Sequence, residues 1–149
     1  MKKILMIAAF STPQYDQAIA DSFKKHGWFV DKVKEDQVFG KRSILTRIER
    51  KIKMGPHVVW LWIQIIKKLI FNKYNVIYFR LCLYYPKYII RVIKYLNTKA
   101  VLICYMNDNP FEYTQQSKHF KYYINNVSLF DINYIFRARN FLHLEKLGS

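Results

Sequence analysis

Glycine is scarce in this chain, and no glycine stands where a nucleotide-binding loop would need it. The 149 residues include four glycines, at positions 27, 40, 55 and 148. A dinucleotide-binding fold needs glycines directly after its first strand, so that the backbone can approach a pyrophosphate. The first apolar run, residues 3–10, is followed by Ser11, Thr12 and Pro13 instead. The absence of such a loop, and of a P-loop, argues against binding of NAD, FAD or ATP by the usual route.

Clustered metal ligands and activated nucleophiles are missing as well. Cys82 and Cys104 lie in apolar surroundings without metal-ligand spacing, which is typical of buried free thiols in a reducing compartment. The four histidines are scattered and form neither an HExxH motif nor a Cys/His cluster. No GxSxG motif is present. We therefore expect no metal site and no cofactor bound by this chain itself.

Long hydrophobic runs are also absent. The best candidate for a membrane span, residues 57–71, is interrupted by Lys67 and Lys68 and falls short of the roughly 20 residues that a bilayer requires. The N-terminal Met-Lys-Lys and residues 4–10 lack a small-residue cleavage site, so a first strand is favoured over a signal peptide. We expect a cytoplasmic protein that is soluble or peripheral to a membrane.

Acidic residues are few, and this gives the chain its strongest compositional bias. Ten Asp and Glu oppose 25 Lys and Arg, for a formal net charge of +15. Such a charge indicates an anionic partner, which can be a nucleic acid, an anionic lipid surface or a phosphorylated substrate. Nucleic acid is the least favoured of the three, because no helix-turn-helix spacing and no aromatic–basic signature for single strands is evident.

Segments of strand and helix character alternate along the chain. This order predicts a single α/β domain over residues 1–149, a three-layer Rossmann-like fold with a mostly parallel sheet of about five strands and right-handed crossovers. The expected strands cover residues 3–10, 28–33, 75–80, 100–106 and 131–136. The expected helices cover residues 14–26, 43–53, 57–71, 86–97, 114–125 and 138–147.

Polar residues directly follow several of the expected strands. Ligands of open α/β sheets bind beyond the carboxyl ends of the strands. Asp108 follows the strand at 100–106 and could orient a sugar hydroxyl or accept its proton. A turn before Pro110, formed by Asp108 and Asn109, explains the same residues without any catalytic role. Candidates for the border of this cleft are Ser11, Thr12, Arg80, Asn107, Asn109 and Arg137.

A basic stretch with interleaved apolar residues covers residues 41–71. Its first part has helical spacing, and its second part carries Trp60 and Trp62 in an apolar run. Such a pair of segments is typical of proteins that lie on an anionic bilayer, where each basic residue contributes on the order of 1 kcal/mol. An ordinary layer helix, with both tryptophans in the core, is the alternative. The residues expected at a membrane surface are Arg42, Arg47, Arg50, Lys51, Lys53, Trp60 and Trp62.

Four segments resemble a known family. They are KILMIAAF…ADSFKKHGWFV, NVIYFR, VLICYMNDNPFEY and the closing FDINYIFRARNFLHLEKLGS, and the last two carry the most specific features. In this order they resemble the N-terminal domain of GT-B glycosyltransferases, in particular the glycosyltransferase-4-like group that includes CgeB-type spore maturation proteins.

The resemblance implies transfer of a sugar from a nucleotide-sugar to a glycan or lipid-linked acceptor, as in the synthesis of cell-envelope polysaccharides. It implies that this domain holds the acceptor, with Asp108 as the tentative catalytic residue. The chain ends at Leu147-Gly148-Ser149, before the family's link to a donor-binding domain. We therefore expect the nucleotide-sugar on a missing domain or a partner subunit. A non-catalytic, basic Rossmann-like binding or regulatory domain at a membrane surface remains the alternative.

Overall fold

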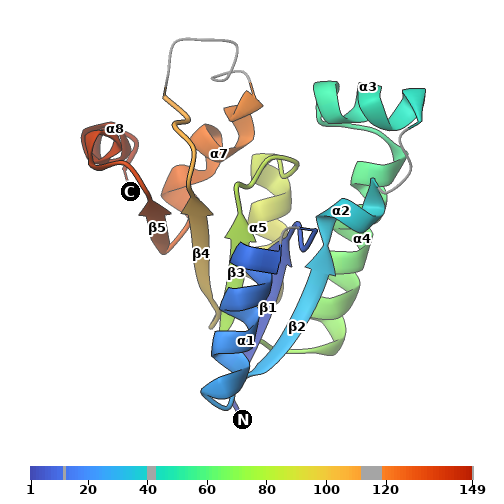
Figure 1. Ribbon diagram of the computed structural model, residues 1–149, viewed down its shortest axis with the longest axis vertical. Helices are drawn as coiled ribbons and strands as arrows, with labels where there is room; N and C mark the ends of the chain where they lie inside the picture. Colours follow the sequence, from blue (N-terminus) through green and yellow to red (C-terminus); the bar gives the residue numbers. More distant parts are fainter. Residues whose placement is uncertain (12, 40–42, 112–118, 149) are drawn as a thin grey trace.

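The computed structural model describes residues 1–11, 13–39, 43–111 and 119–148 and forms one parallel sheet with helices on both faces (Figure 1). The strand order is β2-β1-β3-β4-β5, and every neighbouring pair is parallel. The strands are β1 (Lys3–Ala8), β2 (Phe29–Lys34), β3 (Val76–Arg80), β4 (Val101–Met106) and β5 (Ile132–Ile135). The α/β three-layer prediction is confirmed, and each strand begins and ends within two residues of its expected position.

The order of the strands creates a switch point between β1 and β3. From β1 the chain first crosses to β2 on one side, and then returns to build β3, β4 and β5 on the other side. Connections leaving β1 and β3 therefore diverge at the carboxyl edge of the sheet. In open α/β sheets, this divergence opens a crevice that receives ligands.

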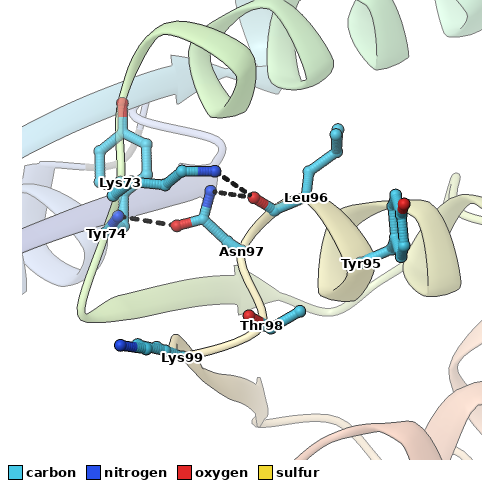
Figure 2. A pocket seen from close by; sticks show the side chains of 7 residues that line it. All are labelled: Lys73, Tyr74, Tyr95, Leu96, Asn97, Thr98 and Lys99. Atoms are coloured by element: carbon cyan, nitrogen blue, oxygen red, sulfur yellow. Dashed lines mark hydrogen bonds between the residues drawn. The ribbon is translucent and has the colours of Figure 1, made fainter.

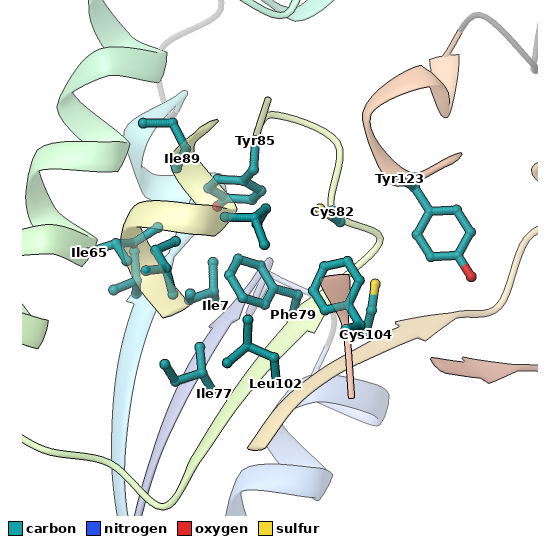
Figure 3. Packing of buried hydrophobic residues seen from close by; sticks show 14 of the residues in the cluster. Ile7, Ile65, Ile77, Phe79, Cys82, Tyr85, Ile89, Leu102, Cys104 and Tyr123 are labelled. Atoms are coloured by element: carbon teal, nitrogen blue, oxygen red, sulfur yellow. The ribbon is translucent and has the colours of Figure 1, made fainter. Parts of the chain in front are cut away.

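The larger face of the sheet holds most of the core. Alternate residues of β1, Leu5 and Ile7, point to this face because side chains alternate along a strand. Helices α4 (Pro56–Phe71), α5 (Lys87–Leu96) and α7 (Lys121–Asn126) cover it. Figure 3 shows Phe79 of β3 among Ile7, Leu102 and Tyr85. The rings of Phe79 and Tyr85 meet edge to face, with 5.2 Å between their centroids.

The opposite face is covered over only part of its width. Helix α1 (Ala18–Lys25), preceded by a π-helical turn (Pro13–Gln17), packs there against β1 and β3 through Ala20, Ile4 and Tyr78. The aromatic side chains of Tyr134 and Phe136, in and just after β5, remain 56% and 75% exposed. The third layer of the fold is therefore complete over the centre of the sheet and open over β5.

The remaining helices at the carboxyl edge are α2 (Glu35–Val38) and α3 (Ile44–Ile52), which follow β2, and the 3₁₀ turn Ala138–Asn140 with α8 (Phe141–Lys146), which follow β5. A further 3₁₀ turn, Val127–Leu129, precedes β5 and lies toward the amino edge of the sheet. The sequence did not predict α2, and part of the helix expected at residues 114–125 lies outside the described residues. Within the described parts of the chain, no helix is long and apolar enough to cross a membrane.

Candidate functional site

A cavity opens at the switch point between β1 and β3. Its volume is about 270 Å³. It lies where the connections after β1, β2 and β3 meet, and α3 contributes one further residue to its wall. The lining residues are Ala9, Ser11, Glu35, Asp36, Phe39, Arg50, Arg80, Leu81, Leu83 and Tyr84. We call this cavity the switch-point pocket.

Arg80, the last residue of β3, is a fixed cation in this pocket. Its Nη1 donates a 3.0 Å hydrogen bond to Oδ1 of the buried Asp16. The guanidinium lies 5.3 Å from the ring centroids of both Tyr15 and Tyr105. Burial raises the pKa of Asp16, and the charge of Arg80 opposes this rise. Nε of Arg80 is buried and makes no hydrogen bond with any described residue.

The backbone directly after Arg80 is strained. Leu81 and Cys82 have left-handed φ angles of 66° and 47°. This conformation costs a residue with a Cβ about 1–2 kcal/mol. It is held by a 3.1 Å hydrogen bond from the Leu81 N–H to the Tyr105 carbonyl, and by the complete burial of Cys82. Strain of this kind is concentrated at functional sites, and Leu81 forms part of the pocket wall.

Glu35 is a buried carboxyl in the wall of the pocket. It is the first residue of α2, immediately after β2, and Tyr85 Oη donates a 2.5 Å hydrogen bond to its Oε1. Burial raises the pKa of Glu35 to about 7. The charges of Asp16 and Asp36 add to the rise, while the Tyr85 hydrogen bond and the charge of Lys53 oppose it. Glu35 can therefore gain or lose a proton near neutral pH.

Lys53 links the pocket to the end of β4. It follows α3 in a left-handed conformation, with Nζ 4.8 Å from the Tyr84 ring centroid and 3.2 Å from Nδ1 of His119. Burial lowers the pKa of Lys53 to about 8, and the charge of Glu35 opposes this effect. Burial and the charge of Lys53 also lower the pKa of His119, whereas the nearby charge of Asp108 raises it. Charged groups along the carboxyl edge thus influence one another's pKa in sequence. Glu35 acts on Lys53, and Lys53 and Asp108 both act on His119.

The structure brings two of the predicted cleft residues, Ser11 and Arg80, into the switch-point pocket. Asp108 is exposed and is not part of the pocket wall. Asn109 is buried, and its Oδ1 accepts a 3.3 Å hydrogen bond from the Phe111 N–H. This is a local turn at Asn109, one of the two residues for which the sequence left a turn open as an alternative.

The other predicted cleft residues lie away from the pocket or outside the described residues. Asn107 has a buried Oδ1 that makes no hydrogen bond with any described residue. Arg137 is exposed after the edge strand β5, beyond the pocket wall. Thr12 lies outside the described residues.

Sequence reasoning missed Glu35 and Asp36, and it assigned Arg50 to a membrane surface rather than to this pocket. The pair Glu35–Asp36 directly follows the second strand, as Asp108 follows the fourth, so the same strand-end argument applies to it. Arg50 gave no comparable signal, because only the packing of α3 brings it to the pocket. Its Nη2 donates a 3.2 Å hydrogen bond to the Phe39 carbonyl, and its guanidinium lies 5.3 Å from the Phe39 ring centroid.

No protein-family model, curated protein or solved structure matches this chain.

A second hollow, at the opposite edge of the sheet, has the features of a structural joint. It encloses about 340 Å³ between the loop before β3 and the end of α5 (Figure 2). Oδ1 of Asn97 accepts a 2.8 Å hydrogen bond from the Tyr74 N–H, and its Nδ2 donates to the Leu96 carbonyl. Nζ of Lys73 donates to the same carbonyl. These polar groups are satisfied within the protein, so they offer little to a ligand.

The basic stretch at residues 41–71 divides between surface and interior. Arg47, Lys51 and Trp60 are exposed. The prediction that Lys53 and Trp62 lie at the surface is wrong, because they are only 8% and 7% exposed.

Their polar atoms explain why these two side chains turn inward. Nε1 of Trp62 donates a 2.8 Å hydrogen bond to the Tyr84 carbonyl, while Nζ of Lys53 lies against the Tyr84 ring and His119. Arg50 is an exposed side chain whose guanidinium is held at Phe39. Arg42 lies outside the described residues. Among the residues that the structure does describe, no group of acidic, histidine and cysteine side chains could hold a metal ion.

Proposed function

We propose that the switch-point pocket binds a negatively charged, hydroxyl-bearing ligand, and that the chain is the acceptor-side part of a glycosyltransferase. The observation that carries this proposal is the buried Glu35, with its pKa of about 7, in the same pocket wall as Arg50 and Arg80. A base with a pKa near neutrality is suited to accepting a proton from an attacking hydroxyl. Guanidinium groups are suited to holding a phosphate or carboxylate on the same ligand.

The mixture of groups in the pocket also suits a sugar. Asp36 and Ser11 offer hydrogen-bonding oxygens, and the half-buried Tyr84 offers a ring. In this proposal Glu35 is the proton acceptor nearest the ligand. Asp108, the residue first expected in this role, does not touch the ligand in this proposal. Its charge raises the pKa of His119, which in turn contacts Lys53. The nucleotide-sugar donor would be held by a further domain or a partner subunit, and the acceptor would be a glycan or a polyprenyl-linked sugar.

We place this reaction at the cytoplasmic face of a cell membrane. The net charge of +15 supports this setting, because anionic lipids attract a basic protein and bring it to lipid-linked acceptors.

The ligand proposal is tested at Arg50, with Arg47 as a matched control on the same helix. Arg50 lines the pocket, whereas Arg47 does not. Binding of mannose 1-phosphate, mannose and inorganic phosphate is measured by calorimetry for the wild type, Arg50→Gln and Arg47→Gln. We expect mannose 1-phosphate to bind and Arg50→Gln to weaken it about tenfold, which corresponds to one charge-assisted hydrogen bond of about 1.4 kcal/mol. Equal affinities of the two variants would contradict the proposal.

A second candidate function is a non-catalytic binding or regulatory domain at a membrane surface. The exposed apolar side of α3, described below, favours it. Co-expression with the products of neighbouring genes, followed by a sugar-transfer assay with nucleotide-sugars, separates the two. Transfer that depends on Glu35 supports the enzyme, and membrane binding without transfer supports the second candidate. Nucleic-acid binding is the least supported, and it would show as retention on DNA or RNA that falls steeply with salt.

A further inference from the structure

Helix α3 buries two polar side chains against the protein and exposes its apolar side to solvent. Thr46 and Glu49 are 3% and 1% exposed. The opposite side is a continuous stripe at helical spacing, formed by residues that are 49% to 77% exposed. We call it the outer stripe, and it consists of Ile44, Leu45, Ile48 and Ile52. A surface helix of a globular protein normally has the reverse orientation.

Specific contacts fix this reversed orientation. The carboxylate of Glu49 accepts hydrogen bonds from the backbone N–H of His57 at 3.3 Å and from its Nδ1 at 2.7 Å. His57 is in the first turn of α4, where a helix has free N–H groups and favours a negative charge. Ser43 and Thr46 cap the start of α3 reciprocally. The outer stripe is therefore exposed because the other side of the helix is anchored.

Charge indicates what would cover the outer stripe. Arg47 and Lys51 are exposed on the same helix, while its one acidic residue, Glu49, is buried. A second copy of this chain would bring equal cations together at the contact. An anionic bilayer instead complements the cations and also receives the apolar side chains. On α4, three residues after His57, the exposed Trp60 is a residue type that prefers the membrane interface.

We propose that α3 docks the protein on an anionic membrane, with the outer stripe in the boundary between headgroups and acyl chains. This inference rests on the membrane setting proposed above and names the element that makes the contact. Figure 1 shows α3 at the carboxyl edge of the sheet, the same edge as the switch-point pocket. Arg50 belongs to both, so docking brings the pocket to the level of the lipid headgroups.

The test is co-sedimentation with vesicles of equal parts phosphatidylglycerol and phosphatidylcholine, and with vesicles of phosphatidylcholine alone. The variant is Ile44→Ser/Ile48→Ser. Its control is Ile70→Ser/Phe71→Ser, which removes two equally exposed apolar side chains from the opposite end of α4. Because all four side chains are exposed, both variants should keep the wild-type thermal midpoint. We expect the wild type to prefer the anionic vesicles, and the α3 variant to lose at least tenfold in partitioning while the control loses less than twofold.

The outcomes distinguish two claims: that the protein binds an anionic membrane, and that α3 is the helix that makes the contact. If the wild type binds anionic vesicles and both variants bind equally well, or weaken equally, α3 is not the docking helix, although the membrane setting stands. If the wild type does not bind anionic vesicles, both the setting and the docking helix are overturned. If Ile44→Ser/Ile48→Ser instead abolishes binding of a partner subunit and leaves vesicle binding intact, the outer stripe is a protein interface and the inference is wrong.

Discussion

The Glu35 carboxyl couples the stability of this protein to pH. Its pKa is about 7 in the folded protein, against 4.5 for an ordinary Glu in an unfolded chain. Between these values the folded state holds a proton that the unfolded state releases. Protonation therefore favours folding, and the stabilisation is complete below about pH 4.5 and lost as the pH rises to about 7.

Because protonation of Glu35 favours folding, the free energy of unfolding should fall by roughly 3 kcal/mol between about pH 4.5 and pH 7 through Glu35 alone. Glu35→Gln should remove this component, because the amide is neutral at every pH and its oxygen still accepts the hydrogen bond from Tyr85. Urea unfolding at several pH values measures how the free energy of unfolding depends on pH in the wild type and in the variant. A wild type and variant with parallel pH profiles would show that Glu35 ionises normally.

At the scale of elements, the turn between α3 and α4 depends on Gly55. Its φ of +143° is a region that side chains with a Cβ rarely adopt. A Cβ at this position would also overlap the side chain of Glu49, the residue that caps α4. The turn therefore allows two helices to share one carboxylate only because residue 55 has no side chain.

Gly55→Ala should destabilise the protein by about 2–4 kcal/mol, since it adds backbone strain and displaces the Glu49 carboxylate. Gly27→Ala is the matched control. Its φ is +77°, but a Cβ there has no atom within 4 Å, so only the strain of about 1–2 kcal/mol is expected. Thermal or urea unfolding compares the two variants. Equal losses would mean that the contact with Glu49 contributes nothing.

The sequence predicted the regular elements well because they follow local patterns. The strands are short apolar runs that end at turn-forming residues, and Pro56 and Pro86 mark the starts of α4 and α5. Helix α2 was missed because four residues are too few to show a helical period. The inward side of α3 was also out of reach, since a hydrophobic period indicates that a helix has two sides and not which one is buried.

The site was predictable as a region and not as a set of residues. Parallel strands place their carboxyl ends at one edge, and this led to Ser11 and Arg80. Arg50 and Tyr84 reach the same pocket through tertiary packing that no local pattern encodes. The inward turn of Trp62 likewise depends on the carbonyl of Tyr84, 22 residues further along the chain.

At the scale of the whole molecule, the reactivity of the two cysteines depends on whether the core is folded. Cys82 and Cys104 are completely buried, free thiols in the larger core cluster. Burial raises the pKa of both thiols, so neither the access nor the thiolate that a reagent needs is available in the folded state.

We therefore expect no thiol of the native protein to react with dithiobis(nitrobenzoate) on the timescale of minutes, and both to react at once in concentrated urea. At intermediate urea, the labelling rate should follow the population of unfolded molecules. Absorbance of the released thiolate measures both. Fast labelling of one thiol in the native protein would indicate that its part of the core opens independently.

Helix α3 presents Arg50 to the pocket and the outer stripe to the surroundings, so both of the binding events proposed above would involve one element. Where two ligands both favour the same placement of a helix, thermodynamic linkage makes their effects reciprocal. A ligand in the pocket would then strengthen membrane attachment by the same factor by which the membrane strengthens binding of the ligand. Attachment would thereby become a measure of pocket occupancy, and the protein would leave the surface more readily when its pocket is empty.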